Sequence, residues 1–288
     1  MANLKEIRNR ITSIKSTMQI TSAMKMVSAA KLKKAQDAIV AMRPYSSKLT
    51  ELLQNLSATL DSDAGGAYSE QREVSKVLLV VVTSNRGLCG GFNSSITKEV
   101  VKTIKEKYVN TSVEIFSIGK KGADVLSKGH NLVATRNDLY DDLTFDNTAA
   151  VAEKLMGMYV DGTYDRIEII YNQFKNAATQ IPQVEQFLPI KPIEGGDATA
   201  VNSDYIFEPS KVEIVEALIP KSLKTQLYKA LRDSFASEHG ARMTAMHKAT
   251  DNATELRDEL LLTYNKARQA AITNEILEIV GGAEALNN

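Results

Sequence analysis

Apolar residues recur in alternating steps of three and four along the first sixty residues of the chain. Seventeen positions belong to this series: Leu4, Ile7, Ile11, Ile14, Met18, Thr21, Lys25, Ser28, Leu32, Ala35, Ile39, Met42, Ser46, Leu49, Leu53, Leu56 and Leu60. Thirteen of them are apolar. A heptad register kept over this length places one continuous apolar seam on a helix, which is typical of a coiled coil and rare for a surface helix of a globular domain.

Three polar residues stand next to one another in this series, at positions Thr21, Lys25 and Ser28. An apolar residue comes directly before each of them, at positions Ile20, Met24 and Val27. We therefore expect these apolar residues to flank the seam in place of the polar ones.

A second long helix is predicted from about residue 210 to residue 285. Between Lys221 and Val280 the chain has no proline and a single glycine, Gly240, and strong helix formers are frequent. The positions from Lys221 to Val280 alone span roughly 90 Å as a helix, so the helix needs a partner of similar length. Its seam is predicted from small and apolar residues three or four apart: Ala241, Ala245, Ala249, Ala253, Leu256, Leu260, Tyr264, Ala267 and Ala271.

The residues between the two helices have a different pattern, which begins after a polar break at residues 61–66. Apolar, β-branched runs predict strands at Val77–Val82, Val113–Ile118 and Arg166–Phe174, and an edge strand at Gln180–Leu188, since Pro182 does not suit a central strand. Helices are predicted at Asn93–Tyr108, Gly122–Ser127 and Thr148–Val160, the last of them capped by Asn147.

Alternating strands and helices predict a small, Rossmann-like α/β domain with a largely parallel sheet. The expected fold class is therefore α/β, with a long antiparallel coiled coil of N- and C-terminal helices and the α/β domain inserted between them. We expect the N-terminal coiled-coil helix at residues 1–60, the α/β globular domain at residues 61–208 and the C-terminal coiled-coil helix at residues 209–288.

Charge is balanced over the whole chain but not over the N-terminal helix. The 288 residues carry 35 basic and 35 acidic side chains, whereas residues 1–48 carry ten basic and two acidic ones. A solvated helix face and a contact with an acidic protein partner explain this excess equally well. Nucleic acid is a weaker hypothesis, because the apolar face of the helix is needed for the seam.

The longest wholly apolar run, Val77–Val82, is far shorter than the roughly twenty residues of a membrane helix, and the N-terminus lacks the apolar core of a signal peptide. We expect a protein without a membrane span, which reaches a membrane only through other proteins. The single cysteine, Cys89, excludes an internal disulfide and suits a reducing compartment.

The strongest catalytic candidate is the turn Thr83–Asn93, whose sequence is TSNRGLCGGFN. It links the first strand to its helix, which is where dinucleotide folds bind pyrophosphate. Its glycines have the spacing G-x-x-G-G and not G-x-G-x-x-G, so a tight structural turn is the favoured interpretation.

The other candidates for chemistry are weaker. His130, His239 and His247 lack the three- or four-residue spacing of metal ligands on one helix face. A nucleophilic Cys89 would need a base, and a packed thiol is favoured. The acidic loop at residues 138–146 is more typical of a solvated loop than of a cation site. We therefore predict no catalytic residue, no cofactor and no metal.

Three motifs together resemble a known family. They are ITSAMKMVSAAKLKKAQ at Ile20–Gln36, RGLCGG at Arg86–Gly91, and YNKARQA at Tyr264–Ala270 followed by IT-x-E-x-x-E-x-x-x-GA at Ile272–Ala283. They resemble the gamma subunit of F-type ATP synthases of the bacterial type. The similarity covers essentially the whole chain, and the terminal motifs are highly specific.

The resemblance implies a non-catalytic central rotor shaft. Such a shaft couples proton or sodium flow through the membrane ring to ATP synthesis or hydrolysis at the beta-subunit sites by rotating within the alpha/beta ring. The implied partners are the alpha and beta subunits of the head, the epsilon subunit and the membrane rotor ring. With no transit peptide before Met1, the expected location is the cytoplasmic side of the cell inner membrane, as a peripheral protein.

Matching positions carry the family's contact residues onto this chain. Contacts with the alpha/beta ring are implied for Met24, Lys25, Lys31, Lys33, Lys34, Arg268, Gln269 and Thr273. Contacts with the membrane ring are implied for Tyr205, Phe207 and Glu208. The family often has tyrosine where this chain has Phe207, so no hydroxyl contact is expected there.

Two other functions remain as alternatives. An NAD-type enzyme with helical arms would need a cofactor fingerprint, which is missing. A generic coiled-coil adaptor fits the heptads equally well but does not explain the terminal motifs.

Overall fold

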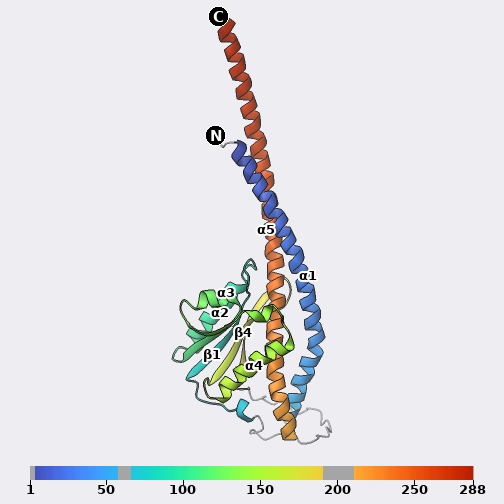
Figure 1. Ribbon diagram of the computed structural model, residues 1–288, viewed down its shortest axis with the longest axis vertical. Coiled ribbons are helices and arrows are strands. Elements are labelled where there is room, and N and C mark those ends of the chain that lie inside the picture. The colour runs from blue at the N-terminus through green and yellow to red at the C-terminus, as the bar shows by residue number, and fades with distance from the viewer. Residues whose placement is uncertain (1–3, 58–65, 191–210, 288) are drawn as a thin grey trace. The chain divides into compact units, whose positions relative to one another are not determined.

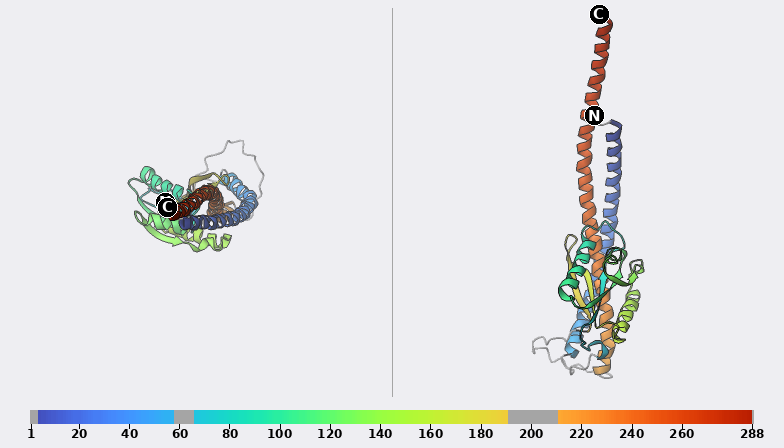
Figure 2. Two further views of the ribbon diagram at one scale, coloured as in Figure 1. Left: turned by 90° about the horizontal axis from the view of Figure 1, so that it is seen from above. Right: turned by 90° about the vertical axis from the view of Figure 1, so that its left-hand side faces the viewer.

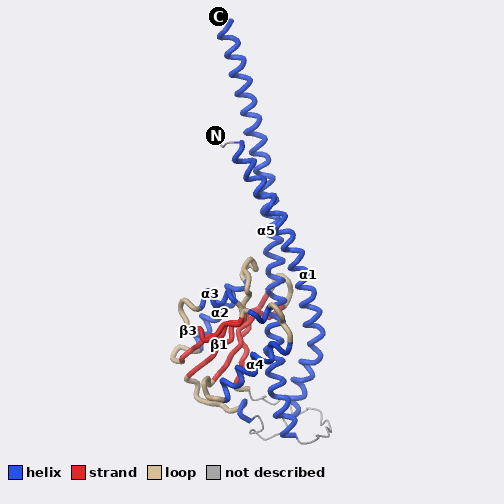
Figure 3. Tube along the Cα trace, viewed as in Figure 1, coloured by secondary structure: helices blue, strands red, loops and turns tan. Residues whose placement is uncertain are grey.

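The computed structural model describes residues 4–57, 66–190 and 211–287. Two long helices, α1 (Leu4–Ser57) and α5 (Lys211–Asn287), flank an α/β domain in the sequence (Figures 1 and 3). Its strands are β1 (Lys76–Val82), β2 (Ser112–Ile118), β3 (Asn131–Arg136), β4 (Arg166–Phe174) and β5 (Gln180–Leu188). Its helices are α2 (Phe92–Lys107), α3 (Lys120–Leu126) and α4 (Phe145–Val160), with short 3-10 helices at Gly66–Tyr68 and Asp138–Tyr140. The predicted fold class is confirmed.

The five strands form one sheet in the order β3-β2-β1-β4-β5. Neighbouring strands are parallel, except that β5 is antiparallel to β4. Pro182 lies in β5 at the edge of the sheet, as predicted, where its missing amide hydrogen does not interrupt a ladder. All six residues of Val77–Val82 in β1 have zero exposure, because helices cover both faces of the central strand.

Two predictions about this domain are wrong. Strand β3 was not predicted, because it is a half-exposed edge strand whose apolar signal is weak; even Val133 is 42% exposed. Helix α4 begins at Phe145, and its N-cap is Thr144, which accepts a hydrogen bond from Asn147 N at 3.3 Å. Asn147 therefore lies in the first turn and is not the cap; both residue types suit that role. The other predicted boundaries agree within two residues.

Side chains of β1 alternate between two hydrophobic cores. The even-numbered residues of Val77–Val82 belong to a cluster with α4 and α5, and the odd-numbered ones to a cluster with α2 and α3. Two helices thus cover each face of the sheet.

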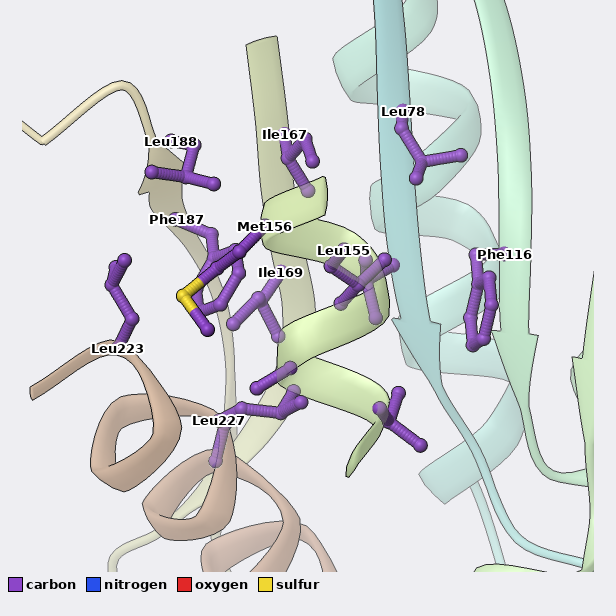
Figure 4. Packing of buried hydrophobic residues seen from close by; sticks show 14 of the residues in the cluster. Leu78, Phe116, Leu155, Met156, Ile167, Ile169, Phe187, Leu188, Leu223 and Leu227 are labelled. Carbon is purple, nitrogen blue, oxygen red and sulfur yellow. The ribbon is translucent and has the colours of Figure 1, made fainter. Parts of the chain in front are cut away.

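Helix α5 supplies one wall of the first core. Leu223 and Leu227 of α5 face Met156 of α4 and Phe187 of β5 (Figure 4). Each leucine buried in this way stabilises the fold by about 1.5–3 kcal/mol. The middle of α5 is therefore part of the core of the α/β domain and not an arm attached to it.

The chain divides into two compact units, one of residues 1–28 with 243–288 and one of residues 29–242. In the first unit α1 and α5 are antiparallel, since Thr21 Oγ1 lies 2.8 Å from Thr250 Oγ1 and Lys25 Nζ lies 3.3 Å from His247 Nδ1. The predicted domain boundaries near residues 60 and 208 fall outside the described residues and stay predictions.

The predicted seam of α1 is confirmed wherever the side chains are described. Its buried apolar members are Ile7, Ile11, Leu32, Ala35, Ile39 and Leu49, while Leu53, Leu56 and Leu60 lie outside the described side chains. The expectation for the polar stretch is wrong at two of its three pairs of positions, whereas Met24 and Lys25 are both half-buried. Thr21 and Ser28 are 9% and 3% exposed, whereas Ile20 and Val27 are 60% and 57% exposed. The heptad register continues through the small polar residues, and Thr21 bonds to Thr250 across the seam.

The seam of α5 is confirmed over most of its length. Ala241 is buried, and its half-buried members are Ala245, Ala249, Ala253, Leu260, Tyr264 and Ala267. Leu256 and Ala271 are exposed, so these two seam predictions are wrong. Every residue from Arg268 to Ala283 is exposed, because α5 extends past the first turn of α1 (Figures 1 and 2). Among the described helices, none has an apolar stretch long enough to cross a membrane.

Candidate functional site

The loop that follows β1 forms a tight turn held by its own side chains. Ser84 Oγ donates to Arg86 O at 2.7 Å, and Ser84 N donates to Asn93 Oδ1 at 3.0 Å. Leu88 and Gly90 have positive φ values of 62° and 57°. This conformation costs a leucine on the order of 1 kcal/mol, so the turn needs further contacts to keep its shape.

Arg242 of α5 supplies those contacts. Its Nη2 donates to Arg86 O at 3.1 Å and to Gly87 O at 3.2 Å. Its Nη1 pairs with Glu238 Oε1 at 2.7 Å, and both side chains are only 9% exposed. We call Arg86, Gly87, Glu238 and Arg242 the turn–helix contact. It attaches the loop after β1 to one position on the long helix.

Burial governs the protonation of the groups beside this contact. It raises the pKa of the Glu238 carboxyl, although the positive charges of Arg242 and Lys31 oppose the shift. It lowers the pKa of the His239 imidazole to about 3, and the same two charges add to that effect. His239 Nδ1 lies 3.4 Å from Arg242 Nη1, and it acts as the acceptor because a guanidinium can only donate. His239 is therefore neutral in the folded protein.

Helix α5 also fills the crevice in which this type of sheet binds ligands. In a doubly wound fold that crevice lies at the carboxyl ends of the two strands where the chain order reverses, here β1 and β4. Ser237 Oγ of α5 donates to Asn172 O of β4 at 3.0 Å. A Cβ added at Gly240 would lie 3.1 Å from Ala177 Cα, so the helix backbone touches the loop after β4. These contacts support the prediction that Thr83–Asn93 is a structural turn.

Cys89 lies in the same turn and has the character of a packed thiol. It is 2% exposed and clusters with Phe92 and Ala241. Burial raises the pKa of the thiol, which disfavours the nucleophilic thiolate. In the described part of the chain, no cluster of three or more potential metal ligands occurs.

The long helices present two exposed surfaces that no described part of the chain covers. On α1, the outward side chains include Ile20 and Val27, and further along the helix Lys31, Lys33 and Lys34. On α5, the turns beyond α1 expose Ile272, Ile276, Leu277, Ile279 and Val280, each at 48–66%. Exposed apolar residues gathered in this way indicate a surface that binds another protein.

Comparisons with known proteins identify the family. A family model described as ATP synthase matches residues 3–286. The ATP synthase gamma chain of Flavobacterium johnsoniae is 72% identical over 287 residues, covering 100% of both chains. That of Christiangramia forsetii is 65% identical, again over 100% of both chains. This chain belongs to the ATP synthase gamma-chain family.

Solved structures of ATP synthases have the same fold. The central stalk and c-ring structure of Tetrahymena thermophila mitochondrial ATP synthase contains a chain that is 26% identical to this one. The two align with a TM-score of 0.60, and the alignment covers 80% of this chain and 99% of the other. A chain of the Euglena gracilis enzyme in rotational state 3 is 24% identical, with a TM-score of 0.69 and coverage of 98% and 94%, and shows the fold alone. The resemblance to the gamma subunit is confirmed, and with it the role of central rotor shaft.

Those predicted ring-contact residues that the structure describes lie on the two exposed surfaces or beside them. Those of α1 are the half-buried Met24 and Lys25 and the exposed Lys31, Lys33 and Lys34, and those of α5 are the exposed Arg268, Gln269 and Thr273. Lys33 also pairs with Asp37 at 2.9 Å on the helix surface. Their contacts with the ring stay predictions, and Tyr205, Phe207 and Glu208 lie outside the described residues.

Sequence reasoning missed one part of these surfaces and, away from them, the turn–helix contact. Ile20 and Val27 were assigned to the flank of the seam, and a stricter reading of the heptad register would have placed them outside it. The partner of the turn was also missed. Arg86 and Arg242 are separated by 156 positions, so no local pattern connects them.

Proposed function

We propose that this gamma-family chain acts as a rotor shaft that carries out no bond chemistry itself. It transmits rotation between the membrane ring and the catalytic sites of the surrounding alpha and beta subunits. Its association with the membrane is peripheral, on the cytoplasmic side of the inner membrane, and depends on its partner subunits.

One observation carries this proposal. Helix α5 is continuous over 77 residues, and it serves both as a wall of the α/β core, through Leu223 and Leu227, and as the exposed apolar end near residues 268–283. A single helix that packs into a folded domain and also presents an exposed end links the two along one element of the chain, as a shaft that passes on torque requires. The ring contacts proposed at Arg268, Gln269 and Thr273 lie on that end.

The position of α5 in the crevice at the carboxyl ends of β1 and β4 supports the proposal that the chain carries out no bond chemistry. Gly240 and Ser237 of α5 occupy the position at which an α/β domain of this type would hold a cofactor. The buried thiol of Cys89 and the neutral His239 are both engaged in packing within the turn–helix region. This arrangement disfavours the NAD-type enzyme.

A single-molecule rotation assay tests the proposal. We would replace the only cysteine by alanine (Cys89→Ala) and introduce one at the exposed Asp161 in the α/β domain (Asp161→Cys) to attach a bead. The chain would be assembled with the alpha and beta subunits of its own organism. We expect ATP to drive rotation of the bead in one direction, and a chain truncated after Ala267 to lose sustained torque.

Two outcomes would contradict the proposal. Assembled particles that hydrolyse ATP while the bead stays stationary would exclude the shaft. A chain that remains a free monomer and leaves ATP hydrolysis unchanged would favour the adaptor. Calorimetric titration of the isolated chain with NAD tests the enzyme alternative separately, and we expect no binding.

A further inference from the structure

An open groove lies between α2 and α3, on the face of the sheet opposite α4 and α5. Its volume is about 530 Å³. Apolar side chains of Val101, Val125 and Leu126 line it, and Val125 is 56% exposed. The shaft function described above makes no use of this groove.

Three lysines of α2, namely Lys98, Lys102 and Lys105, also line the groove. Their spacing of four and three residues puts them on one face of the helix, where like charges repel one another and destabilise it. Glu106 is the one carboxylate among the lining residues. The groove thus combines an apolar surface with an excess of positive charge, although the whole chain has no net charge.

The three lysines have no ion-pair partner within the described chain, whereas two other lysines of α2 and α3 are paired. Lys107, on the same helix, pairs with the buried Glu168, and Lys121 of α3 pairs with Asp124 at 3.5 Å. Carboxylates supplied by a partner would remove the repulsion between the three lysines. The charge pattern therefore indicates an acidic ligand.

The dimensions of the groove indicate a helix as that ligand. Lys98 and Lys105 are seven residues apart, so the row of charges is about 10 Å long, or two helical turns. An open groove buries little of a small molecule, whereas an amphipathic helix can lay its apolar face into it. A lipid surface fits less well, because no aromatic side chain lines the groove as an interfacial anchor.

We propose that the α2–α3 groove is a docking site for an acidic amphipathic helix of another subunit of the ATP synthase. Apolar residues of that helix would contact Val101 and Val125. Carboxylates at spacings of three and four on its flank would pair with the three lysines. The helix is defined by this chemistry, whichever subunit carries it.

Photo-crosslinking in the purified, complete ATP synthase of the same organism tests the proposal. The photoreactive amino acid p-benzoylphenylalanine replaces Val125 in the groove, and in a control enzyme it replaces Val109, which is 73% exposed and does not line the groove. Mass spectrometry identifies the crosslinked segment. We expect the Val125 probe, and not the Val109 probe, to react with a helical segment that carries carboxylates at these spacings.

Charge variants separate specific docking from chance proximity. The double variant Lys98→Glu with Lys102→Glu should lower the yield of this crosslink about tenfold, because two attractive pairs become repulsive. The matched control Lys154→Glu with Lys175→Glu changes the net charge equally at exposed positions outside the groove and should leave the yield unchanged. No protein crosslink at Val125, a crosslink to lipid or to a basic segment, or a yield insensitive to Lys98 and Lys102 would each overturn the proposal.

Discussion

Arg242 connects two parts of the chain that are far apart in the sequence. Its guanidinium donates to two carbonyls of the turn after β1, in part-buried bonds, and it pairs with the Glu238 carboxylate, whose side chain is buried like that of Arg242. A buried ion pair adds little net stability by itself, but the loss of one partner leaves an uncompensated charge. The contact therefore makes the position of the turn on α5 sensitive to single substitutions.

The substitution Arg242→Ala should lower the free energy of unfolding by about 3–5 kcal/mol, since it leaves Glu238 buried without its partner. Urea denaturation of the purified chain, followed by circular dichroism, measures this loss. The matched control is Lys224→Ala, which breaks the more exposed pair of Lys224 with Glu153 and should cost less than about 1 kcal/mol. Equal losses in the two variants would show that burial of the pair has no special effect.

The depressed pKa of His239 should make stability depend on pH. The unfolded chain binds a proton at this residue near its usual pKa of 6.5, whereas the folded chain binds it only near 3. In that interval the unfolded state binds more protons, so the stabilisation present above pH 6.5 is lost as the pH falls toward 3.

We expect a change from pH 7 to pH 5 to lower the free energy of unfolding of the natural chain by about 1–2 kcal/mol more than that of the variant His239→Gln. Urea denaturation at a series of pH values measures the difference. If the free energy of unfolding changes with pH equally in the natural chain and in His239→Gln, His239 is not the source of the pH dependence.

At the scale of elements, α5 approaches the sheet closely because it has glycine where it meets the loop after β4. A Cβ at Gly240 would lie 3.1 Å from Ala177 Cα and 3.3 Å from Ala177 O, and both are backbone atoms that cannot move aside easily. Gly157 in α4 offers the opposite case, because nothing lies within 4 Å of the position of its missing Cβ.

The two glycines should respond in opposite ways to alanine. Gly240→Ala should destabilise the chain by about 1–3 kcal/mol, because it forces α5 away from the loop. Gly157→Ala should stabilise it by about 0.5–1 kcal/mol, since alanine favours a helix interior. Thermal unfolding of the two variants measures both effects. If Gly240→Ala were more stable than the natural chain, the close approach of α5 to the loop after β4 would not depend on glycine.

The elements that the sequence predicted well are those whose periodicity extends over many residues. The seam of α1 follows from the heptad pattern, and its register held even through Thr21 and Ser28. Strand β3 could not be found in this way, because an edge strand with one partner has little need for apolar residues. The Arg242 contact depends on the tertiary fold and has no local signal.

At the scale of the whole molecule, the terminal motifs were more informative about function than any single residue. They led to the family that the comparisons confirm, and they assigned ring contacts to side chains that the structure leaves largely exposed. The charge on α1 gives the most direct test of these assignments. Lys33 and Lys34 are both exposed, and the surface pair of Lys33 with Asp37 contributes little.

Reversing the charge with Lys33→Glu and Lys34→Glu should reduce ATP-driven proton pumping by about threefold or more, because repulsion would replace the predicted attraction to an acidic protein partner in the ring. Pumping by the reassembled enzyme in membrane vesicles, measured beside its rate of ATP hydrolysis, gives the coupling. The same reversal at Lys154 and Lys175 should leave the ratio unchanged. Normal pumping by the Lys33 and Lys34 variant would rule out the charge assignment.

The role of α5 as a wall of the α/β core has a consequence for how the protein is made. Strands β1 to β5 leave the ribosome before Leu223, Leu227 and Leu231, which complete their hydrophobic core. At ordinary rates of synthesis, roughly 2 to 9 seconds pass between the emergence of Leu188 and that of Leu231. During this time one apolar face of the nascent sheet lacks α5, one of its two covering helices, and is a natural substrate for a chaperone. The chain can complete this domain only after most of its length has been translated.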